Sequence, residues 1–557
     1  MPQEVSGFLG AERLTYGPWQ ALERAVVRLL VHSGWKDVVH IGRTGDNGGD
    51  VLGTIGAKDW VVQVKFNGTR GRTHSKGVND VQRAIAFYDA DQGAVATNTA
   101  FSEGAVRRRT ELKATGFNIE LWDGATLLDM YKQLPSRGSL EPPRGYQEEA
   151  VGILLKALES GENRCLIVLA TGLGKSYIAG AFISQAIDAN PERKVLWLAH
   201  QRELVAQLER SAWPHLKKST ATHLWLGGER PAFAEGVTFA TFQALASLQA
   251  KGETPPPFSV VIVDEAHHAM AESFRAVLEW LRPEFMVGMT ATPWRGDGQS
   301  IDQLFGPVAF SMSIVEGMRG GFLANVDYRM MVDNLDWRFV ADHSRKGYTV
   351  ADLNRYLFLP DRDEAVADKV LEHWKASESK KGIVFVRSID HAEEFARLLT
   401  SLRLPAAAIS SQTEERERER NLRLFRHGKL SFLVAVDVLN EGIDVPDVDL
   451  VVFLRVTHSR RIFIQQLGRG LRLTREKANV RVLDFVSDIR RIAAGLRLND
   501  EDREYCRAHV GDLERLSLLP GSIVRFSNDR ALEFFSEYLQ DVASVEDLSD
   551  KSKLEFP

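Results

Sequence analysis

The segment 169–176, Leu-Ala-Thr-Gly-Leu-Gly-Lys-Ser, follows an apolar run and precedes a helical pattern. In such a loop, glycines let backbone N–H groups surround a β-phosphate, Lys175 reaches the outer phosphate oxygens, and Ser176 supplies a hydroxyl ligand for Mg²⁺. The loop residues expected around the phosphates are Thr171, Gly172, Leu173 and Gly174. The usual pattern has a glycine where this chain has Leu169, so a glycine-rich turn without a nucleotide is the alternative.

Two adjacent carboxylates follow the apolar run Val260–Val263. If that run is a strand, Asp264 and Glu265 lie at its carboxyl end, where α/β sheets hold their ligands. One carboxylate can hold Mg²⁺ through water while the next polarises the attacking water. Together with the loop 169–176, this pair predicts a site that binds ATP and Mg²⁺ and hydrolyses the nucleotide.

A third group of polar residues lies near the amino terminus. Asp50 ends a Gly/Asp-rich turn, and strand alternation puts Gln63 and Lys65 on one face of an apolar strand. A β-hairpin of this length can bring Asp50 beside them. Such a set suits phosphodiester hydrolysis with Mg²⁺, or Mn²⁺, held by Asp50 and Gln63, with Lys65 steadying the nucleophile or the developing charge. We expect Glu23, on the first helical pattern, to complete the metal shell.

The loop 67–77 after Lys65 suits a phosphate clamp beside the cut site because it is rich in basic side chains. The residues concerned are Arg70, Arg72 and Lys76. The run Arg107–Arg109 suits the same role, although a basic run on a helix is more often simply solvated. His74, His267 and His268 have no metal-ligand spacing with one another or with cysteine, so no zinc site is expected.

The elements that must hold these residues follow from apolar periodicity. A helical pattern covers 19–32, a strand 60–66, a second helix 78–89, and short strands 93–97 and 118–122. This alternation predicts one α/β domain over residues 1–134. The Pro/Gly/Ser-rich stretch 135–143 then predicts a linker.

Downstream, apolar strand-like runs alternate with helical patterns in two series, as in parallel sheets built from βα units. The first series comprises 165–169, 194–199, 237–240, 260–263 and 285–289, and the second 382–386, 406–409, 431–436, 450–454 and 480–484. We therefore expect an α/β chain with one lobe over 144–322 and a second over 323–490. Residues 491–557 are expected to form a mostly helical extension.

Composition excludes several classes of protein. Hydrophobic residues make up 44% of the 557 residues and charged residues 26%, which excludes disorder as the main state. Two cysteines exclude a disulfide scaffold and a cysteine-ligated zinc site, and they favour a cytoplasmic location. No apolar run suits a membrane helix and no signal peptide is recognised. A net charge of −5 means that a nucleic-acid site must be a local groove.

The motifs occur in an order that resembles superfamily 2 helicases and translocases. They are Arg144-Gly145-Tyr146-Gln147, the loop 169–176, Asp264–His267, Thr290-Ala291-Thr292 and the run 465–472, Gln-Gln-Leu-Gly-Arg-Gly-Leu-Arg. Their form is similar to the motor subunits of type I and III restriction enzymes and to the bacterial repair helicase RadD. The resemblance implies two RecA-like lobes that close on ATP.

The same resemblance implies roles for individual residues. Gln147 would read the adenine edge, with Arg144 and Tyr146 packing nearby, and Thr290 and Thr292 would link the state of ATP to the position of the strand. The motif beginning at Asp437 would face nucleotide and nucleic acid and includes Gly442 and Asp444. Arg469 and Arg472 would act as arginine fingers on the γ-phosphoryl group.

Nucleic-acid contacts are implied by two segments that resemble strand-tracking motifs of the first lobe. They point to Arg202, Thr241 and Gln243 as ligands of DNA phosphates. The alternative is that Arg202 and Gln243 are ordinary surface residues.

The N-terminal domain resembles the Mrr-type branch of the restriction-endonuclease fold. The matching segments include Leu22-Glu23, Gly45–Asp50, Gln63-Val64-Lys65, Ala96-Thr97-Asn98 and Leu121–Gly124. In most of the wider fold an acid stands where this chain has Gln63, which implies weaker metal binding or a larger role for Glu23. The alternative is a nuclease fold that binds DNA without cutting it.

The sequence thus predicts an ATP-dependent DNA helicase or translocase coupled to a Mg²⁺-dependent DNA endonuclease, in restriction, phage defence or repair. The expected partners are duplex or partly single-stranded DNA and accessory subunits of such a system, with no membrane. Two alternatives remain: a DNA-dependent ATPase whose N-terminal domain only binds DNA, and an RNA helicase.

Overall fold

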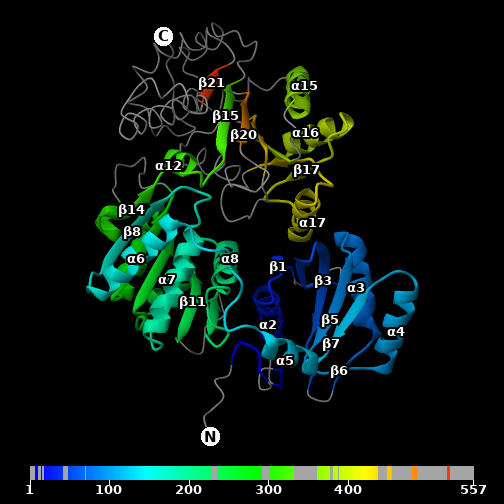
Figure 1. The fold of residues 1–557 in the computed structure, drawn as a ribbon, viewed down its shortest axis with the longest axis horizontal. Helices are drawn as coiled ribbons and strands as arrows, with labels where there is room; N and C mark the ends of the chain where they lie inside the picture. Colours follow the sequence, from blue (N-terminus) through cyan, green and yellow to red (C-terminus); the bar gives the residue numbers. More distant parts are fainter. Residues whose placement is uncertain are drawn as a thin grey trace.

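The structure, a computed structural model, contains three main sheets, each with its own helices (Figure 1). It describes residues 7–10, 14–15, 18–41, 48–68, 71–226, 235–291, 301–330, 360–376, 381–386, 388–436, 448–454, 479–485 and 524–526.

The N-terminal domain is a five-stranded mixed sheet with helices on both faces. Its strands stand in the order β1 (Lys36–His40), β2 (Val51–Ile55), β3 (Lys58–Lys65), β5 (Gln92–Thr97) and β7 (Ile119–Trp122). β1, β2 and β3 pair antiparallel, and β3, β5 and β7 pair parallel. The other elements are α2 (Trp19–His32), α3 (Ser75–Tyr88), α4 (Glu103–Ala114), α5 (Gly124–Gln133) and the short pair β4 (Arg72–Thr73) and β6 (Ala100–Phe101).

Different helices cover the two faces of this sheet. Apolar residues of α2 share a core with Val62 and Val64 of β3, whereas those of α3 share a core with Val61. Because side chains alternate along a strand, Gln63 and Lys65 lie on the α3 face. A Cβ at Gly77 of α3 would lie 3.7 Å from Lys65 Cγ, which confirms that this helix passes over Lys65.

The first lobe is a seven-stranded parallel sheet. Its order is β10 (Thr222–Trp225), β11 (Gly236–Thr241), β9 (Lys194–Ala199), β12 (Val260–Asp264), β13 (Phe285–Thr290), β8 (Arg164–Leu169) and β14 (Val308–Met312). The helices are α6 (Gly145–Glu159), α7 (Lys175–Ala189), α8 (Arg202–Ala212), α9 (Phe242–Ala250), α10 (Glu272–Leu281), α11 (Asp302–Phe305) and α12 (Ile314–Arg319), with a 3₁₀ turn at Ala266–Met270. Since all its strands are parallel, the carboxyl ends of β8, β12 and β13 meet at one edge.

The second lobe is another seven-stranded parallel sheet. Its order is β17 (Ala406–Ile409), β18 (Phe432–Ala435), β16 (Gly382–Phe385), β19 (Leu450–Phe453), β20 (Asn479–Asp484), β15 (Asn325–Met330) and β21 (Val524–Phe526). Its described helices are α15 (Pro360–Ala376), α16 (Ile389–Ser401) and α17 (Glu415–Arg426). The chain changes sheet between β14 and β15.

The structure differs from the sequence-based expectation at several elements. β10, β14 and β15 were not predicted. β10 is short and β15 contains charged residues, whereas β14 (Val-Ala-Phe-Ser-Met) is a short apolar strand that lies at a sheet edge and is largely exposed. Of the segment 491–557, the structure describes residues 524–526, which form the strand β21; the rest of the expected helical extension lies outside the described residues. The strand adds to the second sheet beside β15, which a local pattern could not show.

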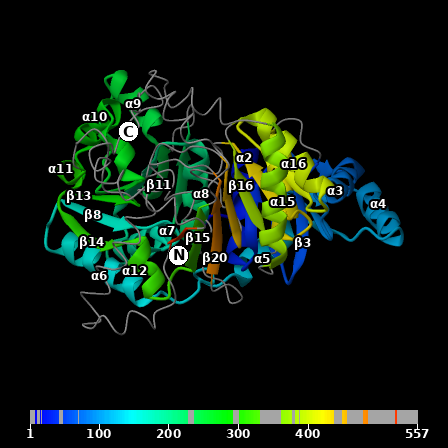
Figure 2. The same cartoon turned by 90° about the horizontal axis from the view of Figure 1, so that it is seen from above.

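The N-terminal domain contacts both lobes (Figures 1 and 2). Helix α2 lies beside α8 of the first lobe, and α17 of the second lobe reaches the sheet end that carries Asp59 and the helix α3. The linker follows the first lobe: Arg137 Nε donates to the His215 carbonyl at 2.9 Å, and Tyr177 Oη donates to the Glu141 carbonyl at 3.0 Å. Among the described helices, none has the length and apolar content to cross a membrane.

Candidate ATP and nuclease sites

The phosphate loop connects β8 to the amino end of α7 at the carboxyl edge of the first sheet. Gly172 (φ +91°) and Gly174 (φ +84°) both adopt the left-handed backbone conformation that glycine tolerates best. Lys175 and Ser176 open α7, so the helix amino terminus and its free N–H groups face the loop. This is a geometry that binds phosphate.

Lys175 from this loop reaches the acids at the end of β12. Its Nζ lies 3.6 Å from Glu265 Oε1, and the two side chains are only 11% and 15% exposed. Glu265 has φ +47°, an unusual value for a residue with a side chain, and strain of this kind accumulates at functional sites. The fold therefore brings together residues that are 90 positions apart in sequence.

Asp264, beside Glu265, fits a divalent cation. Burial, together with the charge of Glu265, raises the pKa of Asp264 to about 7, and the Lys175 ammonium opposes this only in part. A buried carboxylate next to another carboxylate is stabilised by a cation, and carboxylate and hydroxyl oxygens are the ligands that Mg²⁺ prefers. The donor set of Asp264 and Ser176 therefore fits the predicted Mg²⁺.

The residues expected near the adenine pack against the phosphate loop. Tyr146 Oη donates to the Leu173 carbonyl at 2.7 Å, and Gln147 Nε2 donates to the same carbonyl at 3.2 Å. Gln147 Oε1 accepts from the Arg144 backbone N–H at 2.9 Å, which caps α6. Arg144 also donates to the carbonyl of Phe322, just before the second lobe begins. In this structure the Gln147 amide thus contacts the phosphate loop, and both its oxygen and its nitrogen bind protein groups.

A hydrogen bond connects the acidic motif to the next strand. His267 Nδ1 lies 3.0 Å from the Thr290 hydroxyl at the end of β13, and 3.4 Å from Glu265 Oε2. His267 and Thr290 are both buried. Thr290 thereby contacts the histidine that lies beside Glu265; the link predicted for Thr290 stays a prediction.

The predicted nuclease residues Asp50 and Gln63 come together at the α3 face of the N-terminal sheet. Gln63 Nε2 donates to Asp50 Oδ2, and the backbone N–H of Val64 donates to the same oxygen at 2.6 Å. Gln63 Oε1 is buried and has no hydrogen-bond partner among the described residues. An unpartnered buried oxygen beside a carboxylate fits a divalent cation, for which these two residues would supply oxygen ligands.

Glycines in the turn before Asp50 are required by close packing. Gly48 has φ +88°, and a Cβ there would lie 2.3 Å from the Asp80 carbonyl oxygen of α3. A Cβ at Gly49 would lie 2.6 Å from a methyl group of Val61. The Gly-Gly-Asp sequence therefore lets the turn approach α3 and β3 closely enough to set Asp50 beside Gln63.

The other two predicted nuclease residues have different partners. Lys65 Nζ lies 3.3 Å from Asp80 Oδ2, a residue that the sequence did not single out. Glu23 Oε2 lies 2.9 Å from His40 Nε2, and Glu23 belongs to α2, which packs on the opposite face from Lys65. No group of three or more His, Cys, Asp or Glu side chains arranged for a metal is present among the described residues.

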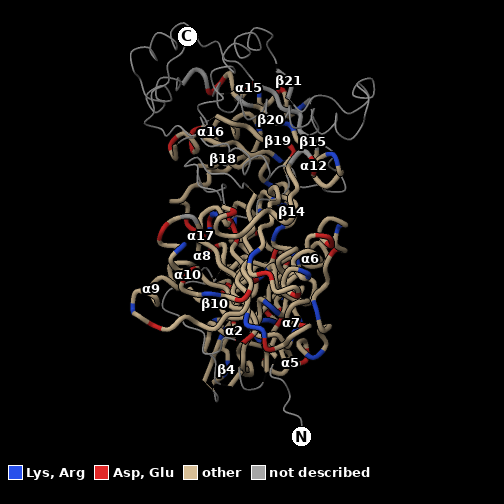
Figure 3. Tube along the Cα trace, turned by 90° about the vertical axis from the view of Figure 1, so that its left-hand side faces the viewer, with Lys and Arg blue, Asp and Glu red and all other residues tan. Residues whose placement is uncertain are grey.

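The predicted DNA-contacting residues differ in their availability. Arg202, Gln243, Arg72 and Lys76 are exposed. Thr241 is buried, and its hydroxyl accepts from the Ala244 N–H at 3.2 Å as the cap of α9. Arg202 lines a cavity of about 550 Å³ between α8, β1 and α17, where all three domains meet. In the view of Figure 3, basic and acidic residues are interspersed along the trace of the described residues.

Some predicted residues lie outside the described part of the chain. They are Arg70, Thr292, Asp437, Gly442, Asp444, Arg469 and Arg472. Their roles remain predictions.

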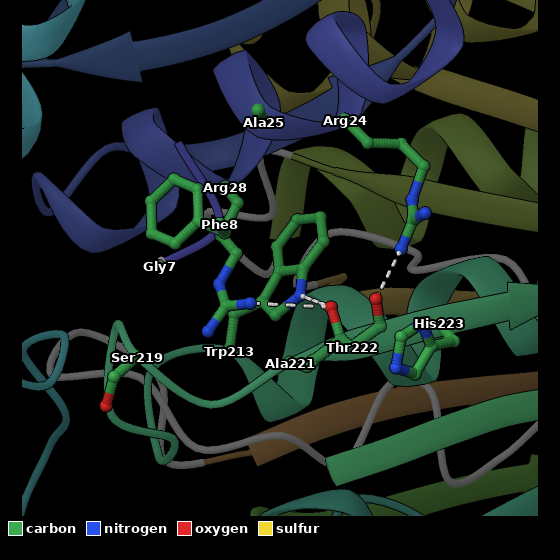
Figure 4. Close-up of a pocket in the computed structure, with 10 residues that line it drawn as sticks. All are labelled: Gly7, Phe8, Arg24, Ala25, Arg28, Trp213, Ser219, Ala221, Thr222 and His223. Atoms are coloured by element: carbon green, nitrogen blue, oxygen red, sulfur yellow. Dashed lines mark hydrogen bonds between the residues drawn. The ribbon is translucent and has the colours of Figure 1, made fainter. Parts of the chain in front are cut away.

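Arg28 of α2 inserts into the first lobe (Figure 4). It donates to the carbonyls of Thr220 at 3.0 Å and Lys217 at 3.1 Å, and its guanidinium lies 4.5 Å from the centre of the Phe8 ring. Arg24, one turn earlier, pairs with the buried Glu209 of α8. Trp213 of the first lobe also packs into the core of the N-terminal domain. The nuclease-like domain and the first lobe therefore share a buried, hydrogen-bonded interface.

Three family models match this chain in the regions just described. Residues 16–131 match the restriction endonuclease model of the Mrr type, residues 141–295 match "Type III restriction enzyme, res subunit", and residues 363–474 match "Helicase conserved C-terminal domain".

Individual relatives agree with these matches. A protein of Saccharomyces cerevisiae named as an ATP-dependent helicase, IRC3, is 24% identical over 74% of this chain and 61% of its own length. The EcoAI type I restriction enzyme endonuclease subunit of Escherichia coli is 26% identical over 66% of this chain and 50% of its own length. The chain thus spans about half to three-fifths of these relatives.

A solved structure shows the same fold. The type ISP restriction-modification enzyme LlaBIII bound to DNA is similar with a TM-score of 0.53 and 16% identity, over 93% of this chain and 41% of that one. Together these comparisons show a restriction endonuclease domain of the Mrr type, a domain of the type III restriction enzyme res subunit and a helicase C-terminal domain, in this order along the chain.

Proposed function

We propose that this protein is an ATP-driven DNA translocase or helicase whose N-terminal domain is a Mg²⁺-dependent DNA endonuclease, working in restriction, phage defence or DNA repair. The observation that carries the motor assignment is the approach of Lys175 to Glu265 beside the buried Asp264. Relatives named as helicases and restriction subunits support it.

In the ATP site, each residue has a chemical task. Mg²⁺, held by Ser176 and Asp264, would neutralise phosphate charge. Lys175 binds the outer phosphate oxygens, and the nearby Glu265 orients and deprotonates the attacking water. His267 holds Glu265 and Thr290 in one network. We assign Arg469 and Arg472 to the second lobe's side of the cleft, where they stabilise the γ-phosphoryl group when the lobes close.

In the nuclease site, Asp50 and Gln63 supply the oxygens that would hold the metal. The metal would polarise the scissile phosphate and lower the pKa of the attacking water. Lys65 steadies the developing negative charge, and Arg72 and Lys76 on the exposed loop bind flanking phosphates. One neutral ligand in place of an acid predicts weaker metal binding, and Mn²⁺ is expected to substitute for Mg²⁺.

The domain contacts support mechanical coupling. The N-terminal domain is fixed to the first lobe through Arg28 and touches the second lobe through α17. Arg202, a proposed strand contact, faces the same three-domain cavity. Movement of the lobes along DNA would therefore act directly on the N-terminal domain, the proposed nuclease. Accessory subunits of a restriction or defence system are proposed as further partners.

The test measures ATPase and DNA cleavage by the wild-type protein and by Asp50→Asn and Lys175→Ala. Substrates are single-stranded DNA, duplex DNA, methylated duplex and RNA, with Mg²⁺ or Mn²⁺. We expect DNA to stimulate the ATPase, and Asp50→Asn to abolish cleavage while ATP hydrolysis continues. Asp129→Asn, an exposed acid on α5 of the same domain, is the matched control.

Two results would replace this proposal. Binding of DNA without cleavage by the wild-type protein under either metal would make the N-terminal domain a binding module. Stronger ATPase stimulation by RNA than by DNA would make the motor an RNA helicase.

A further inference from the structure

Asp80 is a buried acid at the nuclease face of the N-terminal domain, in the first half of α3. Its side chain is 7% exposed. A buried carboxylate needs charged or hydrogen-bonding partners, because desolvation of its charge is costly. Its partners therefore indicate what it does.

The two oxygens of Asp80 bind two different cations. Oδ2 lies 3.3 Å from Lys65 Nζ, and Oδ1 lies 2.7 Å from Arg83 Nη2. Arg83 is 64% exposed and three residues ahead on the same helix, so this pair is an ordinary surface contact. The pair with Lys65 is different, since it joins α3 to β3 and the lysine is only 35% exposed.

Asp80 also lies next to the turn that delivers Asp50. The closest approach to Gly48 is the backbone of Asp80 itself, which lies within 2.6 Å of a Cβ placed on that glycine. Asp50, Gln63, Lys65 and Asp80 therefore gather on one side of the sheet. Because Gln63 carries no charge, Asp50 is the one acid of the pair at the metal position, and Asp80 adds a buried carboxylate next to the turn that carries Asp50.

We propose that Asp80 is a positioning residue of the nuclease, which holds the Lys65 ammonium beside the Asp50–Gln63 pair so that it meets the scissile phosphate. This inference rests on the proposed endonuclease function. A lysine side chain has many rotamers, and a fixed ionic partner removes most of them before substrate arrives. DNA phosphate then meets an ammonium group already in place.

The sequence contains no motif that marks this role. Asp80 stands in the helix after the Gln63-Val64-Lys65 segment, and helical packing of α3 against β3 brings it to Lys65. A different hypothesis is that Asp80 itself is a metal ligand. Measurement of metal affinity distinguishes that role from the positioning of Lys65.

The experiment compares Asp80→Asn and Asp80→Glu with the wild-type protein, and Arg83→Met serves as the control that removes only the exposed pair. Cleavage of plasmid DNA with Mn²⁺ is measured together with DNA affinity, ATPase rate and thermal unfolding. Mn²⁺ affinity is measured by calorimetry without DNA. The rate of amine-specific labelling of Lys65, relative to the exposed Lys58 of the same strand, reports the ion pair independently of catalysis.

We expect Asp80→Asn to lower the cleavage rate about 10- to 100-fold, as loss of a supporting partner does in other sites. Labelling of Lys65 should accelerate, while Mn²⁺ affinity, DNA affinity and ATPase stay near wild type. Asp80→Glu should recover part of the cleavage rate, and Arg83→Met should match the wild type.

Three results would overturn the proposal. Unchanged labelling of Lys65 in Asp80→Asn would show that Asp80 does not hold the ammonium, and a lowered unfolding temperature in that variant would assign it a structural role. A large loss of Mn²⁺ affinity would make Asp80 a ligand. If the wild-type protein cuts no DNA, the endonuclease function fails by itself, and the labelling result still decides whether Asp80 holds Lys65.

Discussion

Arg423 of α17 and Asp59 of β3 form an ion pair between the second lobe and the N-terminal domain, with 3.2 Å between Nη2 and Oδ1. The two side chains are only 6% and 10% exposed, and His427 Nε2 lies 2.8 Å from the other oxygen of Asp59. Asp59 belongs to the same strand as Gln63 and Lys65. The second lobe therefore contacts the strand that carries the proposed nuclease residues.

Replacement of Asp59 by asparagine should loosen this contact. The change leaves Arg423 buried without the Asp59 carboxylate. Removal of one partner of a buried ion pair lowers the free energy of unfolding by about 3–5 kcal/mol. Faster hydrogen exchange in α17 is expected, together with DNA cleavage that depends less on ATP. Asp129→Asn, at an exposed surface pair of α5, controls for the loss of a negative charge. Unchanged exchange in α17 would show that the ion pair does not hold the lobe.

The same contact should weaken in acid. Burial alone raises the pKa of Asp59, but the hydrogen bond from His427 and the charge of Arg423 outweigh it and hold the pKa below the usual 3.8. Burial also lowers the pKa of Arg423, which nevertheless stays charged because its ordinary pKa is so high. A carboxylate with a lowered pKa stabilises the contact fully above its ordinary pKa and loses this effect as the pH falls through the lowered value.

Protection of α17 against exchange, corrected for the intrinsic pH dependence of amide exchange and measured from pH 5 to about pH 2.5, should therefore fall below about pH 4, where the Asp59 carboxylate released from the contact begins to take up a proton. In Asp59→Asn this part of the pH dependence should be absent. An equal acid response in both proteins would attribute the effect to other carboxylates.

Replacement of Arg28 by methionine should detach the N-terminal domain from the first lobe. The carbonyls of Lys217 and Thr220 would lose their donor at a partly buried place, at about 1 kcal/mol each. Limited proteolysis should then cut faster within the linker 135–143, and thermal unfolding should begin earlier. Arg107→Met, at an exposed position of α4, should behave as the wild type. Equal proteolysis of both variants would contradict a holding role for Arg28.

Replacement of Thr290 by valine should uncouple ATP hydrolysis from DNA. The side chain keeps its shape but loses the hydroxyl that contacts His267. We expect basal ATPase within about twofold of the wild type and a loss of most of the stimulation by DNA. The variant lacks only about one hydrogen bond, the one that forms the proposed link between His267 and Thr290. Thr238→Val is the matched control, because Thr238 is buried in β11 of the same sheet and its hydroxyl has no partner among the described residues. Full stimulation of Thr290→Val would remove Thr290 from the coupling path.

Replacement of Lys175 by alanine should stop ATP hydrolysis, with a fall of about 100-fold or more, because a charge that stabilises the transition state is lost. Glu265→Gln should reduce turnover to a similar extent while ATP still binds. Lys156→Ala, at an exposed position of α6, is the control for Lys175→Ala. Turnover by either site variant at the wild-type rate would refute the nucleotide site.

Local patterns were enough for the elements that bury an apolar stripe or run. The helical pattern 19–32 became α2 with the same bounds, and the runs 194–199 and 260–263 became β9 and most of β12. β14 and β15 lie at or near the margins of their sheets, where a strand is recognised by its pairing and not by a long apolar run.

The ATP site could be predicted because each of its parts is a contiguous motif. A loop that wraps a phosphate and a strand that ends in two acids are local structures, and the parallel sheet brings their ends to one edge whatever the intervening sequence. For the same reason, the pairing of Asp50 with Gln63 followed from hairpin geometry.

Contacts between distant elements were decided only by tertiary packing. Nothing in the residue types near Asp80, Arg28 or Arg423 distinguishes them from solvated charges, and each gains its meaning from a partner on another element. The sequence alone therefore determined which chemistry the chain carries, since local motifs hold the reactive groups. The tertiary structure determined which groups support them and how the domains touch, because burial of a charge depends on surfaces that meet only after folding.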